Sequence, residues 1–192
     1  MVNQQATDKI FSFKVVFLGD STVGKTSILK FKVTGQYEET VSTVNSTQNK
    51  ITLEYDGKSI NAALWDTAGQ EEYRSLTPHY LRDAKIAIIV FSVDDKASFD
   101  HLDNWFNLAK DTNSNPVIFL VGNKIDLKES DYHDDNAQKW SQDNEVTLHY
   151  TSAVTGEGIE ELFDSIAAAL TSRSPNDTNN LKITANKLKQ CC

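Results

Sequence analysis

Residues 19 to 26 read Gly-Asp-Ser-Thr-Val-Gly-Lys-Thr, and their types and spacing suit a chain of phosphates. Glycines at both ends let the backbone curl so that N–H groups point at phosphate oxygens, and a following helix would add its positive N-terminal end. Lys25 can reach the β- and γ-phosphates, while the hydroxyl of Thr26 can bind Mg²⁺. ATPases, kinases and GTPases share this P-loop, so the base stays open. The residues expected to contact the nucleotide here are Ser21, Thr22, Val23, Gly24, Lys25, Thr26 and Ser27.

A second group, Asp66-Thr67-Ala68-Gly69-Gln70, follows an apolar run and has the chemistry to handle magnesium and water. At the end of a strand beside the P-loop, the carboxylate of Asp66 can hold Mg²⁺ through water. Gly69 can bring its backbone N–H close to the γ-phosphate. The neutral amide of Gln70 suits a water that attacks an anionic phosphate, because a carboxylate there would add repulsion. We therefore expect Asp66 to be a metal ligand and Gln70 to be catalytic.

A third group, Asn123-Lys124-Ile125-Asp126, also follows an apolar run. Its last carboxylate, Asp126, can accept hydrogen bonds from the N1–H and the exocyclic amino group of guanine. Adenine has no matching pair of donors, and it would leave a buried acceptor unpaired, which is costly. The motif therefore favours GTP over ATP, with Asn123, Lys124 and Asp126 at the base.

Apolar runs alternate with helical patterns along the chain, and this alternation must position the three groups. Strands are expected at residues 11–18, 60–65, 86–93, 117–121 and 146–150, with helical patterns at 99–109 and 159–170. Such continuous apolar runs predict a parallel sheet with helices on both faces and ligands at the carboxyl ends of its strands. Residues 47–55 and 58–65, around Asp56-Gly57, predict a hairpin that adds one antiparallel edge strand. The predicted fold is a three-layer α/β/α P-loop fold with a mostly parallel six-stranded sheet.

Composition sets the wider limits. The chain of 192 residues suits a single domain, expected at 11–170 between a flexible N-terminus (1–10) and a flexible, polar tail (171–192). It lacks an apolar stretch long enough to span a membrane and an apolar signal-peptide core, which favours a cytoplasmic protein. The formal net charge of -8 argues against nucleic-acid binding. Because both cysteines are terminal, stability must come from packing.

Further residues carry a family resemblance. The P-loop together with Asp66 to Gln70 resembles the small GTPases of the Ras superfamily, and Glu71-Glu72-Tyr73-Arg74-Ser75-Leu76 is similar to the Rab family within it. Tyr80-Leu81-Arg82-Asp83-Ala84 resembles an aromatic-x-Arg-x-Ala stretch of Rabs, and the similarity runs from about residue 11 to about residue 170. The resemblance implies a monomeric GTP/GDP switch whose GTP form recruits effectors in vesicle trafficking. An exchange factor, a GTPase-activating protein and a GDP-dissociation inhibitor would complete its cycle.

The resemblance also assigns nucleotide contacts outside the three motifs. It makes Thr43 the threonine that binds Mg²⁺ and meets the γ-phosphate in the GTP state, and Tyr37 the aromatic that covers the guanine edge. Ser152, Ala153 and Val154 stand where the family has Ser-Ala-Lys, a loop whose backbone N–H meets the guanine carbonyl oxygen. The backbone contact does not need a side chain, but Val154 loses the packing of the lysine stem.

The segment after Thr43 departs from the Rab pattern. It reads Val44-Asn45-Ser46-Thr47-Gln48 in place of Ile-Gly, an apolar pair and Phe. In Rabs that phenylalanine forms an apolar patch with aromatics matching Trp65 and Tyr80, and effectors bind this patch. Gln48 makes the patch more polar, so we expect partner choice to have diverged while the nucleotide chemistry persists.

The last two residues, Cys191 and Cys192, follow a polar, mildly basic tail and resemble the doubly geranylgeranylated end of many Rabs. Two lipid chains anchor a protein stably, whereas one holds it only reversibly. The resemblance therefore implies lipidation of both cysteines and cycling onto the cytosolic face of an endomembrane or vesicle.

Three alternatives belong to other functional classes. A GTP-binding scaffold with little turnover is compatible with Asn45, Gln48 and Val154, and an ordinary P-loop ATPase or kinase would prefer ATP. A plain α/β interaction module requires three motifs to fall at carboxyl ends of strands by accident. The chain has no obvious arginine finger of its own, so the favoured GTPase should turn over slowly until an activating protein supplies charge.

Overall fold

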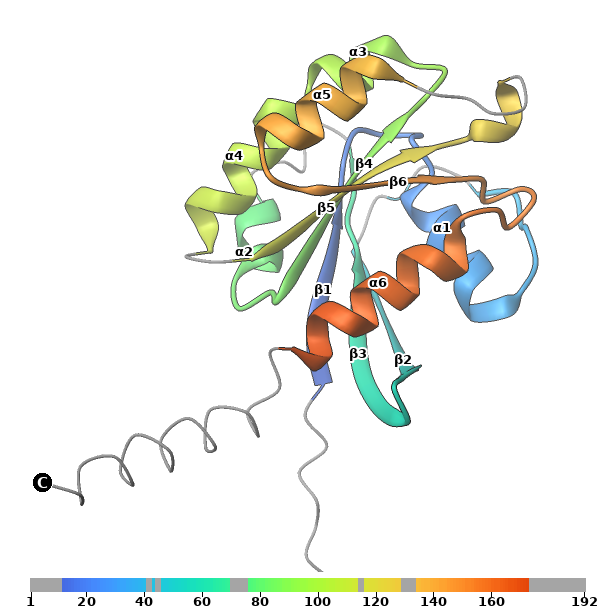
Figure 1. The fold of residues 1–192 in the computed structure, drawn as a ribbon, viewed down its shortest axis with the longest axis vertical. Coiled ribbons are helices and arrows are strands. Elements are labelled where there is room, and N and C mark those ends of the chain that lie inside the picture. The colour runs from blue at the N-terminus through green and yellow to red at the C-terminus, as the bar shows by residue number, and fades with distance from the viewer. Residues whose placement is uncertain are drawn as a thin grey trace, which may run out of the picture.

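Six strands form one sheet in the structure, a computed structural model that describes residues 12–40, 43, 46–69, 76–113, 116–128 and 134–172. The strand order is β2-β3-β1-β4-β5-β6; only the β2–β3 pair is antiparallel (Figure 1). This arrangement confirms the predicted sheet and its antiparallel edge strand. The strand bounds are β1 Ser12–Leu18, β2 Thr47–Tyr55, β3 Lys58–Asp66, β4 Ile86–Ser92, β5 Val117–Asn123 and β6 Thr147–Thr151.

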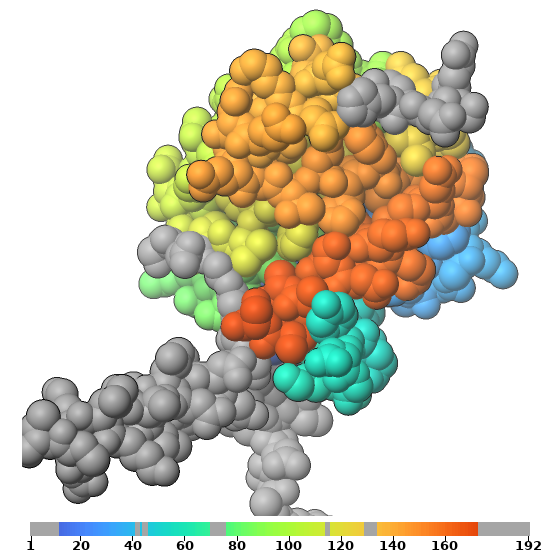
Figure 2. All heavy atoms as spheres, in the orientation of Figure 1, coloured from blue at the N-terminus to red at the C-terminus, as the bar shows by residue number. Residues whose placement is uncertain are grey.

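Helices cover both faces of the sheet and complete three layers (Figure 1). One face carries α1 and α6, and the other carries α2 to α5. In the space-filling view α6 lies directly against the hairpin of β2 and β3 (Figure 2). No helix in the described ranges is long and apolar enough to cross a membrane. The bounds are α1 Lys25–Thr34, α2 Thr77–Leu81, α3 Lys96–Asp100, α4 Leu102–Thr112, α5 Asp135–Asp143 and α6 Ile159–Thr171, with a 3₁₀ helix η2 at Ile125–Leu127.

The strands bury alternate side chains on opposite faces, which explains their continuous apolar runs. In β1, Val15 and Phe17 join the core beneath α1 and α6, whereas Val16 and Leu18 join the core beneath α2 to α5. Every residue of β4 is buried for the same reason. The central strands, whose ends hold the sequence motifs, are therefore packed against helices on both faces.

Strand ends differ from the sequence prediction in a way that matters for function. β3 runs to Asp66 and β5 runs to Asn123, one and two residues beyond the predicted ends at Trp65 and Val121. The prediction was wrong there because it stopped where apolar character stopped, whereas backbone pairing continues: Asp66 is paired with Phe17, and Asn123 with Ser92. Two polar motif residues are thus fixed by the sheet itself. Phe11, residues 1–10 and the tail from residue 173 lie outside the described part of the chain.

Candidate nucleotide site

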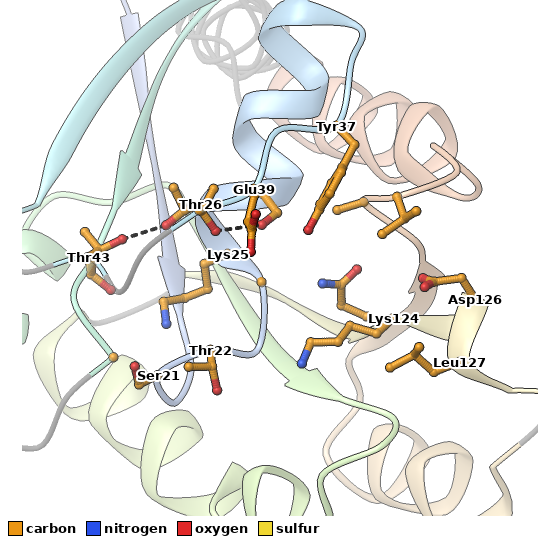
Figure 3. A pocket seen from close by; sticks show the side chains of 18 residues that line it. Ser21, Thr22, Lys25, Thr26, Tyr37, Glu39, Thr43, Lys124, Asp126 and Leu127 are labelled. Atoms are coloured by element: carbon orange, nitrogen blue, oxygen red, sulfur yellow. Dashed lines mark hydrogen bonds between the residues drawn. The ribbon is translucent and has the colours of Figure 1, made fainter.

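The phosphate loop leaves β1 at the point where the strand order reverses, since β1 lies between β3 and β4. Ligands of open α/β sheets bind at such switch points, beyond the carboxyl ends of the strands. A cavity of about 400 Å³ opens there (Figure 3). Its lining comprises Ser21, Thr22, Gly24, Lys25, Thr26, Ser27, Tyr37, Glu39, Thr40, Thr43, Thr67, Gly69, Asn123, Lys124, Asp126, Leu127, Ala153 and Val154.

Two glycines give the loop its shape. Gly19 and Gly24 have φ angles of 135° and 98°, a region that side-chain-bearing residues rarely adopt. A Cβ on Gly19 would lie closer than 3.0 Å to the carbonyl oxygen of Val90, and one on Gly24 equally close to the side chain of Asn123. The loop therefore packs against two neighbouring strands, and larger residues at these positions would push it away.

Lys25 lies across the loop with its ammonium held by main-chain oxygens. The Nζ atom donates hydrogen bonds to the carbonyls of Gly19 at 2.8 Å and Asp20 at 2.6 Å. Burial lowers the pKa of Lys25 from 10.5 to about 8, although the charges of Asp66 and Asp20 oppose the shift. A buried cation with so little solvent is strongly attracted to phosphate oxygens, which would replace the water it has lost.

Three side-chain oxygens converge at one end of the cavity. Thr26 donates its Oγ1–H to Asp66 Oδ2 at 2.6 Å, and Thr43 Oγ1 lies 2.7 Å from Thr26 Oγ1 and 3.3 Å from Asp66 Oδ2. The predicted metal ligands Thr26, Thr43 and Asp66 are thus brought together, and Figure 3 shows the bond between Thr26 and Thr43. Asp66 itself lies beneath Thr26 and is 1% exposed.

The cluster fits a divalent cation. Asp66 Oδ1 is buried and has no hydrogen-bond partner among the described residues. Burial raises the pKa of Asp66, whereas the hydrogen bond from Thr26, the charge of Lys25 and the hydrogen bond from Thr43 oppose that rise. An ionised carboxylate with one buried oxygen unpaired would gain from a further positive charge beside it, and hard oxygen ligands are the ones that Mg²⁺ prefers. The donor set therefore fits Mg²⁺.

Asp126 lies at the other end of the cavity, in η2, and is oriented by Ser152. Ser152 Oγ donates to Asp126 Oδ1 at 2.5 Å and accepts backbone N–H bonds from Val154 at 3.2 Å and Thr155 at 3.1 Å. Because both backbone donors point at the hydroxyl oxygen, the hydroxyl proton is directed at the carboxylate. Ser152 is fully buried and positions Asp126 instead of lining the cavity.

Asn123 fastens the two ends of the cavity together. Its Nδ2 donates to the carbonyl of Val23 in the phosphate loop at 2.9 Å, and its Oδ1 accepts from Thr151 Oγ1 at 3.0 Å. The side chain is 1% exposed, so the bonds are shielded from water. The next residue, Lys124, has a left-handed φ of 68° and turns the chain toward Asp126.

The guanine end is open to solvent on one side. Tyr37 and Val154 are each about half exposed, at 47% and 50%, while Ala153 is buried. Tyr37 lies at the same end of the cavity as Asp126 (Figure 3). Val154 lines the cavity where the family pattern has lysine, so the side chain at this position is shorter than a lysine and apolar.

Sequence reasoning missed four lining residues, and three described residues that it named, Val23, Asp66 and Ser152, do not line the cavity. Glu39, Thr40, Thr67 and Leu127 line the cavity without having been predicted. Thr67 donates its Oγ1–H to the carbonyl of Phe17 at 2.6 Å. Thr67 and Leu127 each follow a predicted residue directly, which was the available signal, whereas Glu39 and Thr40 lie between Tyr37 and Thr43 without adjoining either. Val23 is buried in the core and only its backbone can face a ligand. The predicted catalytic residue Gln70 and the lipidation pair, Cys191 and Cys192, lie outside the described residues.

The loops that form the described site lie within a region of the chain that matches a known protein family. Residues 14–172 match the model of the Ras family, from β1 through α6, and this stretch contains the phosphate loop, Asp66 and Asp126. The match covers most of the 192 residues. The chain therefore belongs to the Ras family of small GTPases, which bind guanine nucleotides, typically with Mg²⁺, and act as switches through regulators and effectors.

Proposed function

We propose that this chain is a Rab-like GTPase that switches between GTP and GDP forms and regulates membrane trafficking. One observation carries the nucleotide part: a single cavity is lined by Lys25, Thr26 and Thr43 at one end and by Asp126 at the other, and both threonines bond the buried Asp66. A phosphate site at one end and a carboxylate at the other suit a guanine nucleotide that lies along the cavity. The Rab assignment is supported by the sequence stretches around Tyr73 and Tyr80.

In the proposed reaction, the protein's residues hold the substrate and orient water. Lys25 and the backbone N–H groups of the loop contact the phosphates, and Thr26, Thr43 and Asp66 would hold Mg²⁺. A bound Mg²⁺ would supply positive charge that offsets the charge developing on the phosphates. Gln70 places a water in line with the γ-phosphorus; the new P–O bond forms as the bond to the bridging oxygen breaks, giving GDP and phosphate. Turnover is slow until an activating protein adds positive charge.

Thr43 is the residue that would sense the γ-phosphate in the proposed switch. Its hydroxyl touches both Thr26 and Asp66, so the segment carrying it is tied to the metal end of the cavity. Loss of the γ-phosphate removes a contact to the Thr43 N–H and another to Gly69, and the two loops relax. An effector that binds only when the γ-phosphate holds the two loops recognises the GTP form, and one that binds only the relaxed loops recognises the GDP form.

The effector surface would differ from that of a standard Rab. Trp65 and Tyr80 pack together with ring centroids 5.8 Å apart, and Gln48 is the cross-strand neighbour of Trp65. A polar amide beside this aromatic pair favours partners that can offer hydrogen bonds. We further propose an exchange factor, a GDP-dissociation inhibitor and cycling between the cytosol and an endomembrane through lipids on Cys191 and Cys192.

Single-turnover phosphate release tests the proposed hydrolysis. The protein is loaded with GTP, Mg²⁺ is added, and phosphate is measured for the wild type and Gln70→Leu. We expect slow release that falls at least about tenfold in the variant, since positioning of the water is lost. Unchanged release would refute the role of Gln70, and no release from the wild type even with Rab-activating proteins would favour a scaffold without turnover.

Lipid anchoring tests the Rab part separately. The full chain is expressed in eukaryotic cells, and its C-terminal peptide is weighed by mass spectrometry in parallel with membrane fractionation. We expect two geranylgeranyl groups, and we expect the Cys191→Ser, Cys192→Ser double variant to move from the membrane fraction to the supernatant. An unmodified wild-type peptide would contradict the Rab assignment while leaving the nucleotide site untouched.

A further inference from the structure

Asp20 is a phosphate-loop residue whose side chain points away from the cavity lining and into contact with a helix. Its Oδ1 accepts a hydrogen bond from Trp105 Nε1 at 2.8 Å, and its Oδ2 lies 2.6 Å from His101 Nδ1. Trp105 belongs to α4, and His101 joins α3 to α4. Trp105 is 1% exposed, so its N–H cannot reach bulk water and depends on such an acceptor.

The main chain of the same residue contacts the machinery of the nucleotide site. The carbonyl of Asp20 accepts a hydrogen bond from Lys25 Nζ at 2.6 Å. A Cβ on Gly69 would lie closer than 3.0 Å to that carbonyl, so the backbone at Gly69 packs directly on it. Asp20 therefore joins three parts of the molecule: α4 through its side chain, and Lys25 and Gly69 through its carbonyl.

We propose that Asp20 is a positioning residue: held by Trp105 and His101, it fixes the carbonyl that aims Lys25 at the phosphates, and it thereby slows release of the nucleotide. The proposal rests on binding of guanine nucleotide by this cavity. It differs from a general stabilising contact because the bonds end on the loop that surrounds the phosphates. Without them, the Asp20 carbonyl and Lys25 shift together, and the bound nucleotide loses a contact made by a desolvated cation.

The chain offers a matched control for the indole bond. Trp140 in α5 donates its Nε1–H to Asp103 at 2.8 Å, the same chemistry and distance as the bond from Trp105 to Asp20, but between two helices. Trp105→Phe and Trp140→Phe each keep an aromatic ring and each remove one indole donor. Only the first removes a bond to the phosphate loop.

The test measures how fast a GDP labelled with a fluorophore on its ribose leaves the full-length protein in Mg²⁺ when unlabelled GDP is added. We expect Trp105→Phe to speed release about tenfold, equivalent to about 1.4 kcal/mol, and Trp140→Phe to stay within about twofold. Thermal unfolding of both variants, recorded in excess GDP, separates loss of nucleotide from loss of fold. Equal release from the two variants, or release from Trp105→Phe within about twofold of wild type, would overturn the proposal.

Variants of Asp20 give a second arm that does not disturb the core. Asp20→Asn keeps one oxygen for the indole donor, whereas Asp20→Ala keeps none, so we expect faster release from the alanine variant. The Asp20→Ala, Trp105→Phe double variant should release GDP no faster than Asp20→Ala alone, because both changes remove the same bond. Fully additive effects would overturn the proposal. A wild-type protein that fails to bind the labelled GDP would instead refute the nucleotide site itself.

Discussion

Replacing Gly69 by alanine should separate GTP hydrolysis from nucleotide binding. A Cβ at this position would lie 2.5 Å from Lys25 Nζ and closer than 3.0 Å to the carbonyl carbon and oxygen of Asp20. Ordinary contacts begin near 3.4 Å. The lysine side chain can bend away, but the Asp20 backbone is part of the phosphate loop, so the Gly69 segment must withdraw by about 1 Å. A displacement of this size at a reacting group can cost about 100-fold in rate.

The assay is single-turnover phosphate release from protein loaded with GTP, together with the dissociation constant for GDP. We expect Gly69→Ala to slow phosphate release about 100-fold while GDP affinity falls by a smaller factor, because GDP lacks the γ-phosphate that Gly69 is expected to meet and is affected only through the displaced Lys25. Gly57→Ala is the control: it lies in the hairpin turn with φ of 69° and nothing within 4 Å of its Cβ. That variant should lose about 1 kcal/mol of stability and keep its hydrolysis rate. Hydrolysis at the wild-type rate by Gly69→Ala would refute the reasoning.

Three further predictions follow from the described contacts. Thr43→Ala should weaken a non-hydrolysable GTP analogue about tenfold and leave GDP nearly unchanged by calorimetry, since its hydroxyl sits with Thr26 and Asp66. Asp126→Asn should lower GDP affinity at least about 100-fold in a competition assay, because the Ser152 hydroxyl holds the amide oxygen and turns the NH₂ toward the guanine donors. Burial lowers the pKa of His149 below its ordinary 6.5, so the unfolded chain takes up a proton that the fold excludes. Urea unfolding should therefore show stability falling as the pH drops below 6.5, with a smaller fall in His149→Asn; an unchanged slope in that variant would assign the loss to other groups.

The fold could be predicted from local patterns because each strand, helix or turn is recognisable from a short stretch of sequence. The P-loop pattern placed Lys25 and Thr26 at the start of a helix after a buried strand, and the structure has β1 followed by α1 at those positions. The turn residues Asp56-Gly57 predicted the hairpin, and this hairpin contains the antiparallel edge strand. Strand ends were missed where a polar residue continued the backbone pairing, as at Asp66.

Contacts between distant residues could not be predicted from the sequence. Asp20 and Trp105 are 85 positions apart, and nothing in either neighbourhood signals the other. Asn123 was expected to contact the nucleotide from its motif, but its hydrogen bond to Val23, 100 residues away, depends on how the loops pack. Thr43 was placed by counting along a family pattern, and the structure brings its hydroxyl to Thr26.

Identification of the nucleotide that co-purifies with the full-length protein tests the central claim most directly. The freshly isolated protein is denatured, and the released small molecules are separated and weighed. We expect GDP or GTP in near-equal amount to the protein, lost in the Asp126→Asn variant and retained in Trp140→Phe. An adenine nucleotide in its place, or no nucleotide together with no uptake of added GDP, would contradict it.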